Sequence, residues 1–143
     1  MKGVVRVVVG YTGGDAPDPD YFDIKDHTEA LFIEFNPKLV SYLEILQLWH
    51  NNDYPWEPEI LRERSAVFYV TDSQHDEALS FLRKLSSSRP NCYLYVDLEP
   101  IKKFYQAEAY QQNYVAKQCR AAREKMIQWA NNEAQSGLYT ILE

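Results

Sequence analysis

The sequence has only two cysteines, Cys92 and Cys119, among 143 residues. So few cysteines exclude a disulfide framework, and these two lack the paired spacing of a zinc site. The three histidines are scattered and show no metal-binding spacing either. We therefore predict that the chain uses no metal and no cofactor. We expect it in a reducing intracellular compartment, with the cytoplasm as the default and an organelle left open.

Positive charge and long apolar runs are also scarce. The chain has 15 Lys and Arg against 21 Asp and Glu, which gives a formal net charge of -6 at pH 7. This balance argues against nucleic-acid and membrane partners, because a nucleic-acid binder or a binder of anionic membranes needs a basic surface. The N-terminal apolar run is short and is split by Arg6, unlike a signal peptide. No run has the length of a membrane span, so we expect one globular domain over residues 1–143.

The stretch from Val7 to Phe35 carries the strongest functional pattern. A strand rich in β-branched residues over Val4–Val9 ends at the glycine-rich turn Gly10–Gly14, and a Pro/Asp loop leads to a second strand, Thr28–Phe35. Glu29 stands at the start of that second strand and shares the parity of its drier face. A carboxylate there is costly unless it is hydrogen-bonded or protonated, which makes Glu29 a candidate acid.

The remaining elements follow from apolar periodicity and helix caps. The order is strand, strand, helix, strand, helix, strand, helix, with a short last strand over Leu138–Leu142. This order favours an α+β fold, a two-layer sandwich with a mixed sheet of the split βαβ, ferredoxin-like kind. The other expected elements are a helix opened by a capping box of Ser41 and Glu44, a strand over Ser65–Val70, a helix capped by Asp72 or Ser73, a strand over Cys92–Leu98 and a helix from about Ala107 to Trp129.

Several short motifs in a fixed order carry a resemblance to a known family. They are VGYTGG at Val9–Gly14, HTEA at His27–Ala30, RSA at Arg64–Ala66 and FYQAEAYQQNY at Phe104–Tyr114, together with Ser41-Tyr42, which opens a helix ending in Trp49 and Asp53. With these motifs the chain resembles the class A peptide methionine sulfoxide reductases over most of its length. The resemblance implies that family's fold.

The resemblance also implies a chemistry, the reduction of methionine S-sulfoxide. In that chemistry a cysteine thiolate attacks the sulfoxide sulfur while a protonated glutamic acid and tyrosines meet the charge on oxygen. Glu29 matches the acid by position. Candidate substrate-binding residues by the same resemblance are Tyr11, Tyr21, Asp53, Glu108 and Tyr110. A methionine- or methionine sulfoxide-containing peptide or protein is then the expected partner.

The sequence departs from the family pattern at functional positions. The Gly-Cys-Phe-Trp motif that holds the nucleophile does not occur, and neither do the first strand and helix of the family pattern. Glu63 stands where the family has a second tyrosine, and Gln111 replaces a histidine. By their period, Cys92 and Cys119 both fall on apolar stripes and are expected to be inert core cysteines.

Three hypotheses follow from these departures. In the first, the chain is a non-catalytic member that binds a peptide or partner through a residual pocket. In the second, it is an active peptide-methionine (S)-S-oxide reductase whose native form carries an N-terminal extension or uses another cysteine. In the third, it is a structural subunit whose unpaired sheet edge is filled by Leu138–Leu142 or by a second copy in a homo-oligomer.

Overall fold

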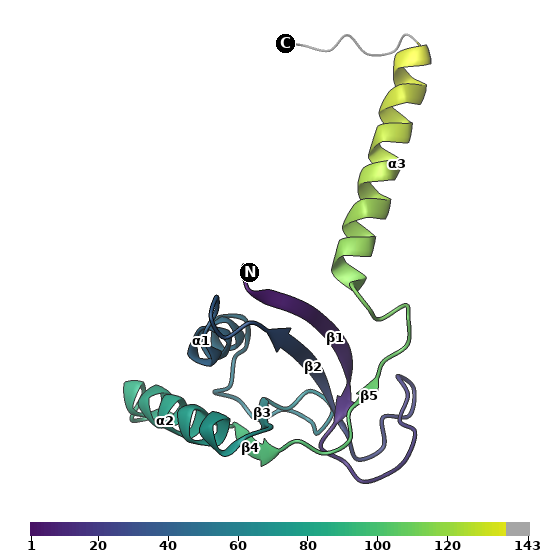
Figure 1. Cartoon of the computed structure of the whole chain (residues 1–143). Helices are drawn as coiled ribbons and strands as arrows, with labels where there is room; N and C mark the ends of the chain where they lie inside the picture. Colours follow the sequence, from purple (N-terminus) through teal and green to yellow (C-terminus); the bar gives the residue numbers. More distant parts are fainter. Residues whose placement is uncertain (137–143) are drawn as a thin grey trace. The chain divides into compact units, whose positions relative to one another are not determined.

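The computed structural model describes residues 1–136 and divides the chain into two compact units, Met1–Glu108 and Ala109–Glu143. Each unit is described by itself, and the single domain over residues 1–143 stays a prediction. The α+β class is confirmed, with strands of mixed orientation (Figure 1). The elements are β1 (Val4–Thr12), β2 (Thr28–Phe35), α1 (Tyr42–Asn52), β3 (Ala66–Tyr69), α2 (Asp72–Ser88), β4 (Asp97–Pro100), β5 (Tyr105–Gln106) and α3 (Tyr114–Ser136).

The first unit contains two sheets. Strands β2, β1 and β5 form an antiparallel sheet in that order, and β3 pairs in parallel with β4. We expected one sheet with both parallel and antiparallel strands, but the described strands form one antiparallel and one parallel sheet. An edge strand of each sheet, β2 or β3, lines a groove that belongs to the candidate site.

The β1–β2 hairpin is the longest strand pairing among the described residues. β2 has the predicted bounds, whereas β1 continues to Thr12 because Gly10 lets β5 approach its backbone. The prediction of a drier face on β2 is wrong at Leu31, which is 60% exposed. Val5 and Val7, on the same face of β1, are exposed as well, so no described residue of the first unit covers this part of the sheet.

Helix α1 begins as the sequence predicts. The Ser41 side chain accepts from the Glu44 N–H, and the Glu44 carboxylate accepts from the Ser41 N–H, which completes the capping box. The hydrogen bonds from the Ser41 backbone and side chain lower the pKa of Glu44. α2 is capped by Thr71 rather than by Asp72 or Ser73.

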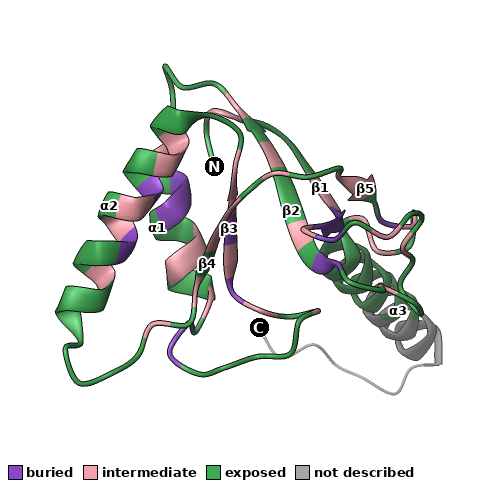
Figure 2. Ribbon diagram, turned by 90° about the horizontal axis from the view of Figure 1, so that it is seen from below, coloured by how far each residue is buried: buried purple, intermediate pink, exposed green. Residues whose placement is uncertain are grey.

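The core of the first unit lies where α1, α2 and β3 meet. Its buried members are Leu46, Val67 and Ala78, one from each of these elements. Figure 2 shows the buried positions of the two helices turned toward each other and toward β3. Partly buried hydrophobic residues around this centre are Tyr42, Trp49, Phe81, Val96 and Leu98.

Several predicted boundaries are corrected by the structure. Cys92–Val96 are not a strand; Tyr95 instead donates its N–H to the Pro55 carbonyl at 2.8 Å, and pairing with β3 starts at Asp97. Helix α3 starts at Tyr114, after Asn113 with a φ of 54°, and not near Ala107, which belongs to the β5 region. The predicted strand Leu138–Leu142 lies outside the described residues. Within the described part, none of the helices is both long and apolar enough to cross a membrane.

Candidate functional site

Glu29 and Arg62 form the centre of the candidate site. Glu29 is paired with Tyr11 in the strand register, and its backbone N–H donates to the Arg62 carbonyl at 2.9 Å. The Arg62 guanidinium donates to Glu29 Oε1 from Nε at 2.6 Å and lies 2.5 Å from it through Nη2. The Glu29 side chain is 39% exposed. Its carboxyl group is thus partly exposed and paired with an arginine, whereas the resemblance implied an acid in an apolar pocket.

Arg62 also holds the loop between β1 and β2. Its Nη1 donates to the Tyr21 carbonyl at 2.9 Å, and its guanidinium lies 4.4 Å from the centre of the Tyr21 ring. Partial burial lowers the pKa of Arg62, but the hydrogen bond and charge of Glu29 outweigh this and raise it overall. Arg62 is a residue that sequence reasoning missed, because nothing in its neighbourhood distinguishes it from a surface arginine.

Glu108 ties two tyrosines to the same region. The Tyr21 backbone N–H donates to Glu108 Oε1 and the Tyr11 hydroxyl donates to Glu108 Oε2, both at 2.9 Å. Tyr11 is buried at 2% exposure, whereas Tyr21 is at the surface. The structure thus brings together four residues that the sequence singled out separately: Tyr11, Tyr21, Glu29 and Glu108.

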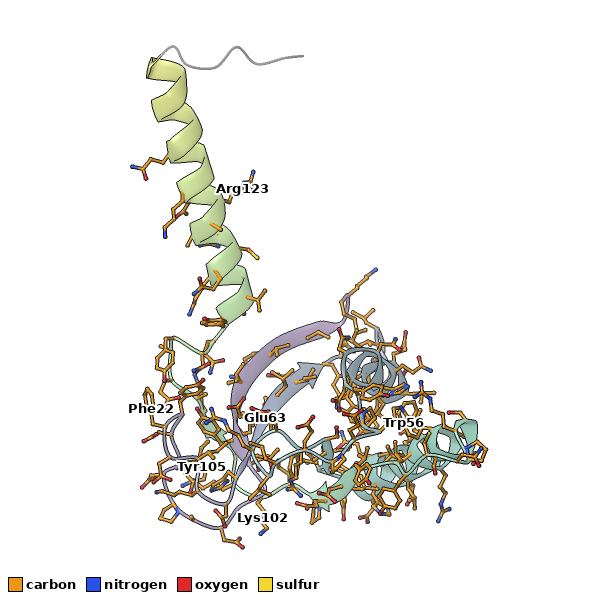
Figure 3. All side chains as sticks on the ribbon, turned by 180° about the vertical axis from the view of Figure 1, so that it is seen from behind. Phe22, Trp56, Glu63, Lys102, Tyr105 and Arg123 are labelled. Atoms are coloured by element: carbon orange, nitrogen blue, oxygen red, sulfur yellow. The ribbon has the colours of Figure 1, made fainter. Side chains whose placement is uncertain are left out.

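The loop between β1 and β2 has its own internal support. His27 is fully buried and bridges two backbone groups: its Nδ1 accepts from the Gly14 N–H at 3.3 Å and its Nε2 lies 2.7 Å from the Ala16 carbonyl. This pattern assigns the neutral ring with its proton on Nε2. His27 also packs edge-on against Tyr105, and Lys102 pairs with Asp15, so β5 and the loop lie together (Figure 3).

Arg64 links the two sheets at the same end of the molecule. Its guanidinium donates to Thr28 Oγ1 at the start of β2, and to the carboxylates of Asp97 and Glu99 in β4. Its side chain is only 16% exposed. The hydrogen bond to Glu99 is the main cause of the raised pKa of Arg64, and Asp97 adds to it against the effect of burial.

A groove of about 700 Å³ opens between β2, β3 and α1. Its apolar walls come mainly from β2, α1 and β3, and its polar lining includes Glu29, Asp53, Glu63, Arg64 and Ser65. Asp53 ends α1 and accepts from the Ser65 hydroxyl at 2.7 Å. Asp53 therefore lines the groove, but its hydrogen bonds go to Tyr54 and Ser65 and not to the Glu29–Arg62 pair.

A sequence model described as peptide methionine sulfoxide reductase matches residues 1–139 of this chain. The chain belongs to this family. The family assignment from the short motifs is thereby confirmed.

Individual relatives of the reductase family agree with the match. The peptide methionine sulfoxide reductase of Drosophila melanogaster is 34% identical over 115 residues, which cover 79% of this chain and 47% of that protein. The enzyme MsrA of Nitrobacter winogradskyi is 34% identical over 121 residues, covering 79% and 67%. The crystal structure of Mxr1 from Saccharomyces cerevisiae in reduced form superposes with a TM-score of 0.68 at 26% identity, covering 80% and 72%. The matched part thus spans about half of the Drosophila relative.

Of the two cysteines of this family member, Cys92 does not line the groove of the first unit, and Cys119 belongs to the second unit. Cys92 follows α2 and donates its N–H to the Arg89 carbonyl, and Cys119 lies in α3 of the second unit. Both are exposed, so the prediction that they are core cysteines is wrong. The pattern misled because residues 92–96 are not a strand, and Val115 on the expected α3 stripe is itself 72% exposed. Tyr110, also in the second unit, is 49% exposed.

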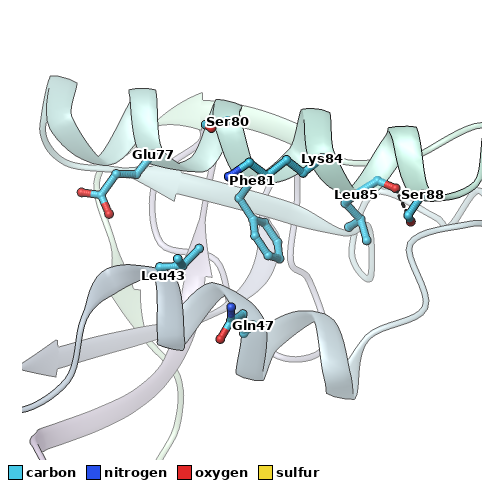
Figure 4. Close-up of a pocket in the computed structure, with 8 residues that line it drawn as sticks. All are labelled: Leu43, Gln47, Glu77, Ser80, Phe81, Lys84, Leu85 and Ser88. Atoms are coloured by element: carbon cyan, nitrogen blue, oxygen red, sulfur yellow. Dashed lines mark hydrogen bonds between the residues drawn. The ribbon is translucent and has the colours of Figure 1, made fainter.

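A second, smaller groove of about 430 Å³ lies between α1 and α2 of the first unit (Figure 4). Leu43 and Gln47 line it from α1, and the Phe81 ring of α2 points between the helices toward them. None of the candidate residues lines this groove. We therefore assign no function to it.

Replacing Glu108 with glutamine is expected to lower the free energy of unfolding, because it weakens the hydrogen bonds from Tyr11 and Tyr21. The Tyr21 N–H is the main cause of the lowered pKa of Glu108, and Tyr11 contributes. Because the folded pKa is lowered, the stabilisation is full above the unfolded value of about 4.3 and is lost as pH falls through the folded value. We expect E108Q to lose about 1 kcal/mol at neutral pH, after allowance for screening by water.

Urea titrations of the wild type and E108Q at pH 7 and near pH 3 measure this effect. The difference between the two proteins should shrink at the lower pH, because a growing share of the wild-type carboxylate is then protonated and, like glutamine, carries no charge. An equal difference at both pH values would show that the charge of Glu108 has no role.

Proposed function

We propose that this chain is a non-catalytic member of the peptide methionine sulfoxide reductase family that binds a methionine- or methionine sulfoxide-containing peptide or protein at the Glu29–Arg62 centre. One observation carries the proposal: in the described part of the first unit, the candidate acid is paired with an arginine, and no cysteine lines its groove. Sulfoxide reduction needs a thiolate at sulfur and a proton donor at oxygen.

The centre is better suited to binding than to proton transfer. A paired carboxylate accepts hydrogen bonds only, whereas a guanidinium has five N–H donors. Arg62 commits donors to Glu29 and to the Tyr21 carbonyl, so it is the group that would meet a sulfoxide oxygen with its remaining N–H groups. Without a thiolate to attack the sulfur, these hydrogen bonds would bind the sulfoxide but would not lead to its reduction.

A second candidate function rests on the exposure of both cysteines. An exposed thiol reaches substrate and reductant more easily than a buried one. This observation favours an active reductase that uses Cys92 or Cys119. A native form that supplies the nucleophile from an N-terminal extension is the other route to an active reductase. For either candidate function, the cytoplasm is the proposed location, as the sequence predicts.

An activity assay separates a non-catalytic member from a reductase that uses Cys92 or Cys119. The chain is incubated with dithiothreitol and a peptide containing methionine S-sulfoxide, beside the double variant C92S/C119S. We expect the wild type to form reduced peptide no faster than the double variant. Thiol-dependent turnover that disappears in the double variant would overturn the non-catalytic proposal.

Calorimetric titration with the same peptide tests binding. Arg62→Met should weaken binding by about tenfold, which corresponds to the loss of one charge-assisted hydrogen bond. Arg6→Met is the matched control, since Arg6 pairs with Glu34 at the surface of the same hairpin. Equal affinity of all three proteins would remove the Glu29–Arg62 centre from consideration as the binding site.

A further inference from the structure

Phe22 has the most exposed large hydrophobic side chain among the described residues. Its exposed fraction is 89%, against 36% for its neighbour Tyr21 (Phe22 is labelled in Figure 3). Single apolar side chains at a protein surface are common and need no function by themselves. Phe22 differs from such residues because the backbone that carries it is fixed in place beside the Glu29–Arg62 centre.

Hydrogen bonds hold the backbone on both sides of Phe22. The Phe22 and Asp23 N–H groups both donate to Asp20 Oδ1 at 2.8 Å, and the Asp20 N–H donates to the Asp23 carbonyl at 3.1 Å. The Tyr21 N–H leaves this turn and donates to the Glu108 carboxylate at 2.9 Å. The turn is thus shaped before a ligand arrives, so a ligand that contacts the Phe22 ring loses little binding free energy to ordering of the loop.

The rings of Phe22 and Tyr21 form a corner that continues the candidate site. Their centres are 5.4 Å apart and their planes meet at 86°. On the other side, the Tyr21 ring lies 4.4 Å from the Arg62 guanidinium, which in turn pairs with Glu29. A carboxylate, a guanidinium and two perpendicular rings therefore follow one another. A ligand group bound by Arg62 has this aromatic corner next to it.

The spacing of the corner fits an extended peptide. The Tyr21 ring separates the Arg62 guanidinium from the Phe22 ring. In an extended peptide, side chains two residues apart point to the same face and are about 7 Å apart along the chain. When Arg62 binds a sulfoxide oxygen, a side chain two residues from the methionine therefore reaches the corner. A large apolar side chain is favoured there, because contact with the two rings removes its surface from water.

The charge of the loop argues against a second copy of the chain as the occupant of the corner. Exposed carboxylates precede and follow Phe22 in the loop, at Asp18, Asp20 and Asp23, and the whole chain has a net charge of -6. A two-fold contact through Phe22 would bring two such loops together, and their like charges would repel. A peptide ligand brings no second acidic loop, so the ligand of the proposed centre is the better occupant.

We propose that Phe22 is a specificity-determining residue, which with Tyr21 selects ligands that carry a large apolar side chain two residues from the methionine sulfoxide. This inference rests on the proposed function, because a sulfoxide bound by Arg62 fixes which ligand side chain reaches Phe22. It goes further by naming the class of ligand, a peptide or protein segment with Phe, Leu, Ile or Trp at that distance from the oxidised methionine.

Calorimetric titration with two peptides tests the inference. Both carry methionine S-sulfoxide at the centre; the Phe peptide has Phe two residues away on each side, and the Ser peptide has Ser at the same two positions. Because both sides are changed, the result does not depend on the direction in which the peptide binds. We expect the wild type to bind the Phe peptide about tenfold more tightly than the Ser peptide.

Variants of Phe22 locate this preference. Phe22→Ala should bring the ratio of the two affinities close to one without changing the affinity for the Ser peptide, whereas Phe22→Tyr should keep the ratio. Tyr93→Ala is the matched control, because Tyr93 is 72% exposed and its ring also meets a neighbouring ring edge-on, that of Tyr95 at 4.6 Å. The control should show the wild-type ratio.

Urea unfolding separates a role in specificity from a structural role. Since the Phe22 side chain is 89% exposed, Phe22→Ala should unfold at the same urea concentration as the wild type. A lower midpoint, combined with an equal loss of affinity for both peptides, would show that Phe22 only supports the loop and would overturn the inference. A dimer in sedimentation velocity that disappears in Phe22→Ala would assign the ring to a second copy and overturn it too.

The proposed centre and the inference fail in different ways. Arg62→Met should weaken both peptides by the same factor, because both present the same sulfoxide. The proposed centre is wrong when Arg62→Met leaves both affinities unchanged, and the inference is wrong when Phe22→Ala leaves the ratio of the two affinities unchanged. Absence of binding of either peptide to the wild type would overturn both.

Discussion

Replacing Arg64 with methionine is expected to lower the free energy of unfolding by about 2 to 3 kcal/mol. The largely buried Arg64 guanidinium is the group that joins Thr28 of β2 to Asp97 and Glu99 of β4. Methionine fills much of the space of the arginine stem but leaves two neighbouring carboxylates facing each other without a cation. The loss is smaller than for a fully buried pair, because the Asp97 side chain is 55% exposed.

Urea unfolding at neutral pH measures this effect, and Arg6→Met is its control. Arg6 pairs with Glu34, but the two side chains are 60% and 52% exposed. An exposed pair of this kind contributes at most about 1 kcal/mol. If the two variants lost the same free energy of unfolding, Arg64 would not be the connection between the sheets that its contacts indicate.

Replacing Gly10 with alanine is expected to cost about 2 kcal/mol and to detach β5 from β1. A Cβ at this position would overlap with the Phe104 ring and with the Tyr105 carbonyl oxygen. The ring could rotate, but the carbonyl belongs to the strand that pairs with Gly10 and Tyr11. The backbone of β5 therefore has to move.

Hydrogen exchange gives a local reading of this change. The Ala107 N–H donates to the Val9 carbonyl at 2.9 Å beside the altered residue, so it should exchange faster in the variant. Val5→Ala in the same strand is the control, because Val5 is 67% exposed and its truncation leaves the β1–β5 contact intact. Unchanged protection of Ala107 in Gly10→Ala would mean that β5 tolerates the extra methyl group.

The elements that sequence could predict are those fixed by local chemistry. The capping box of Ser41 and Glu44 needs only residues three positions apart, and β2 needs only its β-branched and aromatic run between polar loops. The motif also predicts the position of Glu29 at the start of β2. The sequence does not predict the pairing of Glu29 with Arg62, because the two residues are far apart in the chain and meet only in the folded structure.

The errors have the same origin. The alternating pattern from Cys92 to Leu98 is typical of a strand, but Tyr95 pairs with the Pro55 carbonyl of a distant loop instead of with a neighbouring strand. Likewise the alternation in β2 predicted a covered face, whereas Leu31 is exposed because no described element of the first unit packs on it. Periodicity indicates which side chains could be covered, and only the fold decides whether they are.

The bare face formed by Val5, Val7 and Leu31 has a practical consequence for handling the protein. It adjoins a strand with an unused edge, and such a combination is a template for edge-to-edge stacking of like molecules. The net charge of -6 opposes that self-association by mutual repulsion, and salt screens the repulsion. Solubility of the isolated chain should therefore fall as ionic strength rises.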